Sequence, residues 1–329
     1  MGANKSISSD CYPKMIDFIC LPNLPTQMMS AIEFHPTEPK EKPVFSILIP
    51  SWNNLPYLKC CVESIRKNSR YKHEIIVHVN EGKDGTLEWV RAQQLSYTHS
   101  SENVGVCYGF NAPGSLATSE YIVLSDDDFY YAPDWDFYLM EEVNKLKTIY
   151  FCISGTLIEH SKTLYSSMIA PFDFGKTIQE FNEDEFLKKY EQIPFEDWNG
   201  SNWYPLLLHK NIWNSIGGLS IELTPGISSD PDMMIKLWHC GVRYFKGVSK
   251  SRIYHFVSRT VKRVKGNNGN NQFLLKWGLA KSTLFDAYLR LGEKFIDPTP
   301  PPDWSKFRSK LIRDKIKRIF SVWRRNLPT

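Results

Sequence analysis

The chain has 329 residues, 42% of them hydrophobic and 14% aromatic, which is enough to bury the core of one large domain or two small ones. Its net charge of +4 is unevenly distributed. Residues 303–329 carry nine Lys or Arg and two Asp, a net charge of +7 that leaves −3 for the rest of the chain. A body without excess positive charge lacks the basic surface typical of nucleic-acid-binding proteins, so we expect no nucleic-acid partner.

The sequence also bears on the compartment in which the protein works. No apolar run approaches the ~18 residues that a membrane span needs. The first ten residues are polar, unlike the apolar core of a signal peptide. The seven cysteines form no Cys-x-x-Cys pair and favour a reduced environment, so we expect a cytoplasmic protein. Residues 1–6 match the N-myristoylation pattern at Gly2, which is short and common by chance.

The first half of the chain alternates between strand and helix patterns. Residues 1–43 are polar and contain several prolines, so we expect an extension on the outside of the main domain. Strands are predicted at 44–50, 73–79 and 121–124, and helices at 55–67, from 84–86 through 90, and from 103 toward 117. This alternation predicts an α/β fold with a mostly parallel sheet and right-handed crossovers.

The second half is less regular. Strands are predicted at 151–158 and 252–257, and helices at 181–190 and from 229–232 through 238. Asp230 is placed to cap the last of these helices, with Pro231 in its first turn. A stiff Pro-rich linker, residues 297–303, ends a main domain of residues 44–296 and begins a C-terminal segment of residues 297–329.

Three consecutive carboxylates, Asp126, Asp127 and Asp128, follow the strand predicted at 121–124. Asp is disfavoured in strands, and three like charges repel unless a cation lies between them. Alternation along an extended chain places Asp126 and Asp128 on one side and Asp127 on the other. The carboxyl end of such a strand is where α/β sheets bind ligands, so a divalent cation site is expected here; the alternative is a solvated turn.

The ordered set of polar motifs resembles glycosyltransferase family 2 over about residues 45–260, although no single motif is decisive. In chain order the motifs are Pro50 and Asn53, residues 79–86, Asn103 and Gly105, Asp126 and Asp128, Gly217 and Gly218, Asp230 and Asp232, and His255. The resemblance implies the GT-A fold, a Rossmann-like α/β/α sandwich. It also implies metal-dependent, inverting transfer of a sugar from a nucleotide-diphosphate sugar to a hydroxyl of a glycan, lipid-linked or protein-linked acceptor.

The same resemblance implies roles for individual residues. Asp126, Asp128 and His255 would hold Mn²⁺ or Mg²⁺, and an imidazole ligand favours Mn²⁺. Asp230 would be the catalytic base, or it would only cap its helix, and Asp232 would be its partner or an acceptor contact. The nucleotide sugar would contact Pro50, Trp52, Asn53, Asn80, Glu81, Asn103, Gly105, Asp126, Arg259 and Lys262.

The sequence departs from the family at two positions. Val79 stands where the family usually has the Asp that reads the nucleobase, so base recognition is expected to pass to Asn80 or Glu81. Trp52 would stack on the base or belong to the core. Ser229 replaces the Glu that usually precedes the base. Two other functions stay open: a sugar nucleotidyltransferase, which would have a Gly-rich loop after the first strand, and a degenerate carbohydrate-binding or scaffold protein.

The C-terminal segment predicts one basic amphipathic helix over residues 303–325. Its apolar stripe comprises Ile312, Ile316, Ile319, Phe320 and Trp323. Two partners are open for this helix. It can lie on an anionic membrane surface, which would make the enzyme peripheral at a membrane, or the stripe can dock on the main domain or on a second subunit.

Overall fold

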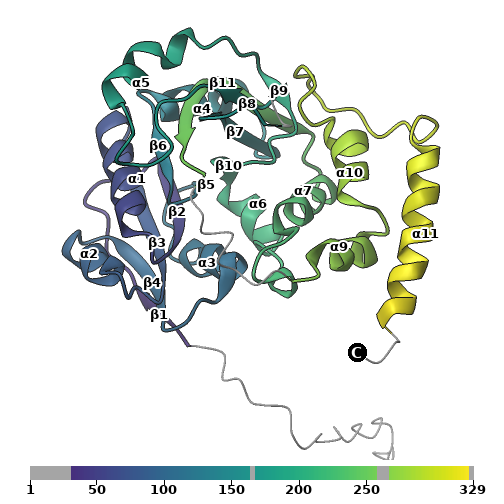
Figure 1. Cartoon of the computed structure of the whole chain (residues 1–329), viewed down its shortest axis with the longest axis horizontal. Coiled ribbons are helices and arrows are strands. Elements are labelled where there is room, and N and C mark those ends of the chain that lie inside the picture. The colour runs from purple at the N-terminus through teal and green to yellow at the C-terminus, as the bar shows by residue number, and fades with distance from the viewer. Residues whose placement is uncertain (1–30, 164–166, 258–266, 326–329) are drawn as a thin grey trace, which may run out of the picture.

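The computed structural model describes residues 31–163, 167–257 and 267–325, with the backbone alone at 322–325 (Figure 1). Gly2, Arg259 and Lys262 therefore lie outside the described residues, as does the side chain of Trp323. Within the described part of the chain, no helix is both long and apolar enough to cross a membrane.

One mixed sheet runs through the molecule in the order β1-β4-β3-β2-β5-β10-β7-β11-β6, with β8 paired to β7 and β9 to β11. The strands are β1 (Ile32–His35), β2 (Phe45–Trp52), β3 (Glu74–Asn80), β4 (Ser96–Ser100), β5 (Tyr121–Leu124), β6 (Phe129–Tyr131), β7 (Phe151–Glu159), β8 (Ile169–Pro171), β9 (Trp198–Asn199), β10 (Leu206–His209) and β11 (Tyr244–His255).

The described helices confirm most of the predicted ones within a few residues. They are α1 (Leu55–Asn68), α2 (Thr86–Ala92), α3 (Gly105–Gly114), α4 (Trp135–Lys145), α5 (Glu183–Lys189), α6 (Lys210–Ser215), α7 (Ser229–His239), α9 (Gly269–Trp277), α10 (Lys281–Thr283) and α11 (Arg308–Arg325), with short helical turns η1 (Tyr190–Gln192), η2 (Ile221–Leu223) and η3 (Leu284–Leu289). Helix α1 packs against β6, α3 against β2 and β3, and α4 against β11.

The predicted strands β2, β3 and β5 pair in parallel at the centre of the sheet, and β4, which was not predicted, pairs in parallel with β3. The three predicted strands are largely apolar because helices cover them, and Ile47, Ile76 and Val123 are fully buried. Strand β10 joins them antiparallel, between β5 and β7. The segment expected on the outside, residues 1–43, contributes β1, which pairs antiparallel with β4 at the sheet edge.

Two elements differ from their predicted bounds. Strand β11 begins at Tyr244, well before the predicted residue 252, because it pairs with β7 along most of its length. Helix α11 begins at Arg308 rather than at residue 303. The carboxylate of Asp303 accepts hydrogen bonds from the backbone nitrogen and the hydroxyl of Ser305, which closes a separate turn ahead of the helix.

The entry into β3 depends on a buried carboxylate. Asp136, in the first turn of α4, accepts hydrogen bonds from the backbone nitrogens of Arg70 at 2.9 Å and Tyr71 at 2.8 Å, and from Nε2 of His73 at 2.9 Å. Burial raises the pKa of Asp136, but these hydrogen bonds outweigh burial and hold the pKa below its ordinary value. The ionised carboxylate therefore stabilises the junction between α1 and β3.

We predict that Asp136→Asn lowers the free energy of unfolding by about 2 kcal/mol near neutral pH, because an amide cannot accept all three hydrogen bonds. Denaturant unfolding measures this loss. The stabilisation by the carboxylate is complete above its unfolded-state pKa of about 4. It disappears as the pH falls through the lower folded-state pKa. The difference in free energy of unfolding between the parent protein and Asp136→Asn should therefore become smaller in acid.

The matched control is Asp134→Asn in the same turn. Asp134 pairs with Arg70 at the surface at 2.8 Å, so its loss should cost less than about 1 kcal/mol. The role assigned to Asp136 would be contradicted if both variants lost equal free energy of unfolding. It would also be contradicted if the loss in Asp136→Asn stayed the same in acid.

Candidate active site at the carboxyl ends of the strands

The three carboxylates after β5 point to two sides of the chain, as the alternation of side chains along an extended segment predicts. Asp127 is buried and accepts hydrogen bonds from Oγ of Ser51 at 2.7 Å and from Nδ2 of Asn54 at 2.9 Å. It therefore ties the end of β5 to the turn between β2 and α1. Asp126 and Asp128 instead belong to a group with His255 whose ligand atoms all lie within 4.8 Å of one another.

Strand pairing brings His255 to these carboxylates. Strand β11 pairs antiparallel with β6, and the backbone nitrogen of Phe256 donates to the carbonyl of Asp128 at 3.2 Å. As a result, Nε2 of His255 lies 3.5 Å from Oδ1 of Asp128. Two carboxylates and an imidazole, from segments far apart in the sequence, thus face one point.

A fourth residue, Glu159, orients the imidazole. Glu159 ends β7 directly beside His255 in the parallel β7–β11 pair, and its Oε1 lies 2.8 Å from Nδ1 of His255. With Nδ1 engaged, Nε2 is the atom left to face Asp128, which is the arrangement that outer carboxylates give to metal-binding histidines. Sequence reasoning missed Glu159, although an acidic residue at the end of an apolar strand was a usable signal.

The electrostatics of this group favour a positive charge among its side chains. Burial lowers the pKa of His255, but Asp128 and Glu159 outweigh burial and raise it to about 10. Burial, followed by the charge of Asp128, raises the pKa of Asp126. The carboxylates therefore repel one another and attract a cation, either an imidazolium or a metal ion.

Asp230 lies in the first turn of α7, and its predicted capping role is wrong. The helix begins one residue earlier, at Ser229, and its N-cap is Ser228, whose φ of 71° is left-handed. Oδ1 of Asp230 instead accepts a hydrogen bond from the hydroxyl of Tyr204 at 2.7 Å. Burial raises the pKa of Asp230, against the opposing effect of the Tyr204 hydrogen bond.

Asp230 and the Asp126–Asp128 group share one region of the molecule. The charge of Asp230 is among the causes that raise the pKa of Asp126, and the charges of both residues raise the pKa of Tyr204 after its burial. Tyr204 is itself buried and its ring packs on Phe110. No sequence motif pointed to Tyr204.

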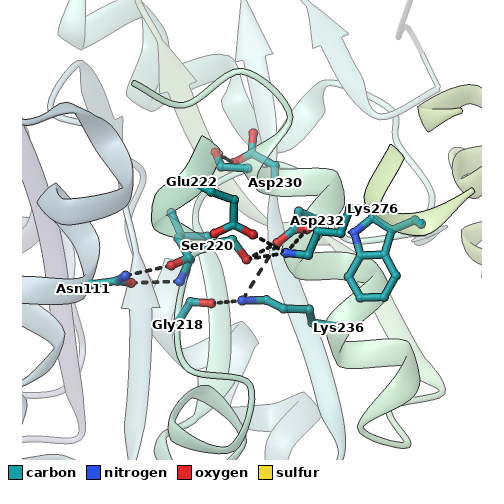
Figure 2. A network of polar contacts seen from close by, with 11 residues as sticks. Asn111, Gly218, Ser220, Glu222, Asp230, Asp232, Lys236 and Lys276 are labelled. Carbon is teal, nitrogen blue, oxygen red and sulfur yellow. Dashed lines mark hydrogen bonds and ion pairs between the residues drawn. The ribbon is translucent and has the colours of Figure 1, made fainter. Parts of the chain in front are cut away.

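Asp232 faces a different set of partners from Asp230 (Figure 2). It is fully buried and accepts hydrogen bonds from Oγ of Ser220 at 2.5 Å and Nε1 of Trp277 at 2.8 Å, and it pairs with Nζ of Lys276 at 2.8 Å. Lys276 also pairs with Glu222 at 2.8 Å. These contacts join α7, η2 and α9, so Asp232 has a structural role here.

The Gly217-Gly218 motif also has a structural explanation. Asn111 on α3 bonds both backbone groups of Leu219 at 2.8 Å (Figure 2). Gly218 has a φ of 62°, and an added Cβ would lie 2.3 Å from Oδ1 of Asn111. Only glycine therefore allows this approach of the turn to α3.

Three of the predicted nucleotide-binding residues lie together at the carboxyl ends of β2 and β3. Nε1 of Trp52 donates to Glu81 at 3.0 Å, and Nδ2 of Asn53 donates to the same carboxylate at 3.2 Å. Lys83 lies 3.0 Å from Glu81, and its hydrogen bond is the largest cause of the lowered pKa of Glu81. Trp52 is half-buried, with its indole edge held against this cluster.

The other predicted nucleotide contacts shape the neighbouring loop between β4 and α3. Oδ1 of Asn80 accepts from the backbone nitrogen of Val104 at 2.9 Å, and Oδ1 of Asn103 accepts from that of Gly105 at 2.9 Å. Gly105 has a φ of 80°, and an added Cβ would lie 2.8 Å from Pro225. Pro50 lies against Gly109, where a Cβ would approach its ring to 2.9 Å.

Comparison with known proteins supports the family resemblance seen in the sequence. The glycosyl transferase family 2 profile matches residues 46–201, which include β2 to β7 and the Asp126–Asp128 group. Over these residues the chain is similar to glycosyltransferase family 2. Asp230 and His255 lie beyond the matched residues, so their places in the site rest on the geometry described above.

Relatives and solved structures agree with this match. An uncharacterized glycosyltransferase of Mycoplasma genitalium is 28% identical over 47% of this chain and 60% of its own length, and the Pasteurella multocida hyaluronan synthase is 24% identical over 71% of this chain and 22% of its own length. The chain thus spans less than two thirds of either relative.

Among solved structures, S. aureus TarS has a TM-score of 0.52 at 14% identity, covering 87% of this chain and 74% of its own. GalNAc-T7, solved with UDP, GalNAc and Mn²⁺, has a TM-score of 0.50 at 14% identity, covering 70% of this chain and 48% of its own. These similarities confirm the GT-A fold.

The two carboxylates of α7 should differ in their effect on stability. We predict that Asp232→Asn lowers the free energy of unfolding by about 2–3 kcal/mol, because Lys276 and two further donors lose a buried carboxylate. Asp230→Asn should change it by less than about 1 kcal/mol, since burial already disfavours the charged form. Equal destabilisation of both variants in denaturant unfolding would contradict the separation of their roles.

Proposed function

We propose that this protein is a metal-dependent glycosyltransferase that moves a sugar from a nucleotide-diphosphate sugar to a hydroxyl acceptor with inversion. The observation that carries the proposal is the convergence of Asp126, Asp128 and His255 on one point. Asp230 lies close enough for its charge to contribute to the raised pKa of Asp126. The family 2 match over residues 46–201 supports the class of reaction.

The donor atoms fit a divalent cation. Asp126 and Asp128 offer carboxylate oxygens, and His255 offers Nε2 with its ring held by Glu159. This mixed oxygen and nitrogen set favours Mn²⁺ over Mg²⁺, which prefers oxygen ligands alone. A cation bound there would neutralise the charge that develops on the leaving diphosphate. GalNAc-T7 was solved with Mn²⁺ and UDP, and TarS with UDP, which supports a nucleoside diphosphate donor.

The nucleotide is proposed to lie across the carboxyl ends of β2, β3 and β5. Trp52, Asn53 and Glu81 form one polar cluster there, and Asp126 follows β5. Because Glu81 already accepts from Trp52 and Asn53, a nucleobase donor would complete its coordination. Arg259 and Lys262 are proposed as diphosphate contacts from the sequence alone.

Asp230 is proposed as the base. Burial raises the pKa of Asp230 above its ordinary value, which strengthens it as a proton acceptor, while the Tyr204 hydrogen bond fixes Oδ1. The acceptor oxygen forms a bond to the anomeric carbon, its proton passes to Asp230, and the bond from that carbon to the phosphate oxygen breaks with its electron pair. A single displacement of this kind inverts the configuration.

We predict that Asp128→Ala abolishes the Mn²⁺-dependent rise in melting temperature that a nucleoside diphosphate should cause in the parent protein. The substitution removes the carboxylate of Asp128, whose oxygen lies within 4.8 Å of the candidate ligand atoms of Asp126 and His255. A thermal-shift panel of nucleoside diphosphates, with Mn²⁺ and with chelator, measures the effect. Glu63→Ala, at an exposed position on α1, is the control.

A graded variant sharpens the same experiment. Glu159→Gln keeps the shape of the side chain but removes the charge behind His255, so the Mn²⁺ affinity should fall by about 10–100-fold without disappearing. Folded Asp128→Ala protein with an unchanged Mn²⁺-dependent shift would rule out the metal site.

We predict that Asp230→Asn lowers the rate of sugar transfer by about 10²–10⁴-fold while nucleotide affinity stays within error, because an amide cannot accept the proton. Transfer and donor hydrolysis are measured with radiolabelled nucleotide sugars, and the affinity by the thermal-shift panel. Near-normal turnover would show that Asp230 is not the base. A loss of nucleotide affinity as large as the loss of rate would place Asp230 in donor binding instead.

A further inference from the structure

Helix α11 is held on the molecule by one face. Asp314 is fully buried and accepts hydrogen bonds from the backbone nitrogen of Ala280 at 2.9 Å and from Oγ1 of Thr283 at 2.5 Å, at the start of α10. Lys310 forms an ion pair with Asp286 of η3. The helix lies beside α9 at the edge of the molecule (Figure 1).

The apolar stripe of α11 faces away from this contact. Ile312 is 52% exposed, Ile316 49%, Ile319 67% and Phe320 62%. At about 100° per residue these four positions form one stripe roughly opposite Asp314. The expectation that the stripe docks on the main domain is therefore wrong for the described residues, because a polar and charged face does the docking instead.

The charges of α11 follow the edges of the stripe. The helix carries eight Lys or Arg, and its one acidic residue, Asp314, is turned toward the domain. Arg313 and Lys317 flank the stripe on one side, and Arg308 and Lys315 on the other; all four are exposed. Solvent therefore meets an apolar centre between two basic rows.

We propose that this face of α11 binds an anionic lipid surface. The apolar stripe would enter the boundary between headgroups and acyl chains, with the helix axis in the plane of the membrane. The basic side chains can bury their stems beside the stripe while their charges reach the lipid phosphates. A helix with this charge distribution lies on a membrane rather than across it, which agrees with the absence of a spanning helix among the described residues.

Charge complementarity favours this occupant over a second copy of the chain. If two α11 helices paired through their apolar stripes, their four basic rows would lie close together, and like charges in close proximity repel. An anionic leaflet can bury the apolar stripe and attract both basic rows at the same time. This binding does not depend on the proposed transfer reaction, so its test is separate from those of the active site.

The test is co-sedimentation of the full chain with vesicles. Binding is expected to vesicles with about 30% phosphatidylserine, to be weak on pure phosphatidylcholine, and to fall by about tenfold or more when salt rises to about 0.5 M. Inorganic phosphate and phosphoserine are included as competitors, since a site for free phosphate would be blocked by them whereas a lipid surface would not.

Three variants separate the contributions. Ile316→Glu with Phe320→Glu removes the apolar stripe, and Arg313→Gln with Lys317→Gln removes one basic row; each pair should lower binding to anionic vesicles by about tenfold or more. Phe34→Glu changes a side chain on β1 that is 50% exposed and should leave binding unchanged. Equal melting temperatures of the variants and the parent protein would indicate that the contacts of Asp314 with Ala280 and Thr283 still hold α11 in place.

The outcomes are distinct. Loss of binding in both α11 variants but not in Phe34→Glu supports the proposal. Unchanged binding in the α11 variants, absence of binding by the parent protein, or displacement by phosphate overturns it. A concentration-dependent dimer in sedimentation velocity that Ile316→Glu with Phe320→Glu abolishes, without vesicle binding, overturns it in favour of self-association.

Discussion

The candidate site depends on the position of β11 between β6 and β7. Antiparallel pairing with β6 sets His255 against Asp128, and parallel pairing with β7 sets it against Glu159. One strand thereby brings an imidazole nitrogen to a cluster of carboxylates that repel one another. A slip of one residue in either pairing would turn the imidazole to the other face of the sheet. The long β7–β11 ladder, which extends far beyond the site, makes such a slip costly.

Helix α7 carries two acidic residues, Asp230 and Asp232, whose contacts differ. Residues two apart on a helix point in different directions, so Asp230 meets Tyr204 while Asp232 meets Ser220, Lys276 and Trp277. The buried contacts of Asp232 fix the helix to η2 and α9. The carboxylate of Asp230 is thus presented by a segment whose orientation is fixed by other contacts, as its proposed role of a base requires.

Much of this arrangement could be predicted from the sequence, because apolar runs and their order locate strands whose carboxyl ends meet. The grouping of Asp126, Asp128 and His255 followed from that order and the family resemblance. Glu159 was missed although it ends an apolar strand, because its contact with His255 depends on lateral register. Tyr204 could not be predicted, because its contact with Asp230 depends on the path of a loop. For α11, periodicity predicted the stripe, but only the tertiary contact of Asp314 decides which face remains exposed.

The distance along the chain between Asp128 and His255 has a consequence for the newly made protein. Synthesis proceeds from the N-terminus at about 5–20 residues per second, so β11 emerges roughly 6–25 seconds after Asp128. During that interval the strand end carries clustered carboxylates without their histidine, and β7 lacks the neighbour that covers one edge. The nascent chain therefore exposes a strand edge beside a patch of negative charge, and inward or edge charges of this kind discourage pairing with other chains. The carboxylates of the candidate site would thus also disfavour pairing of the unfinished sheet with other chains.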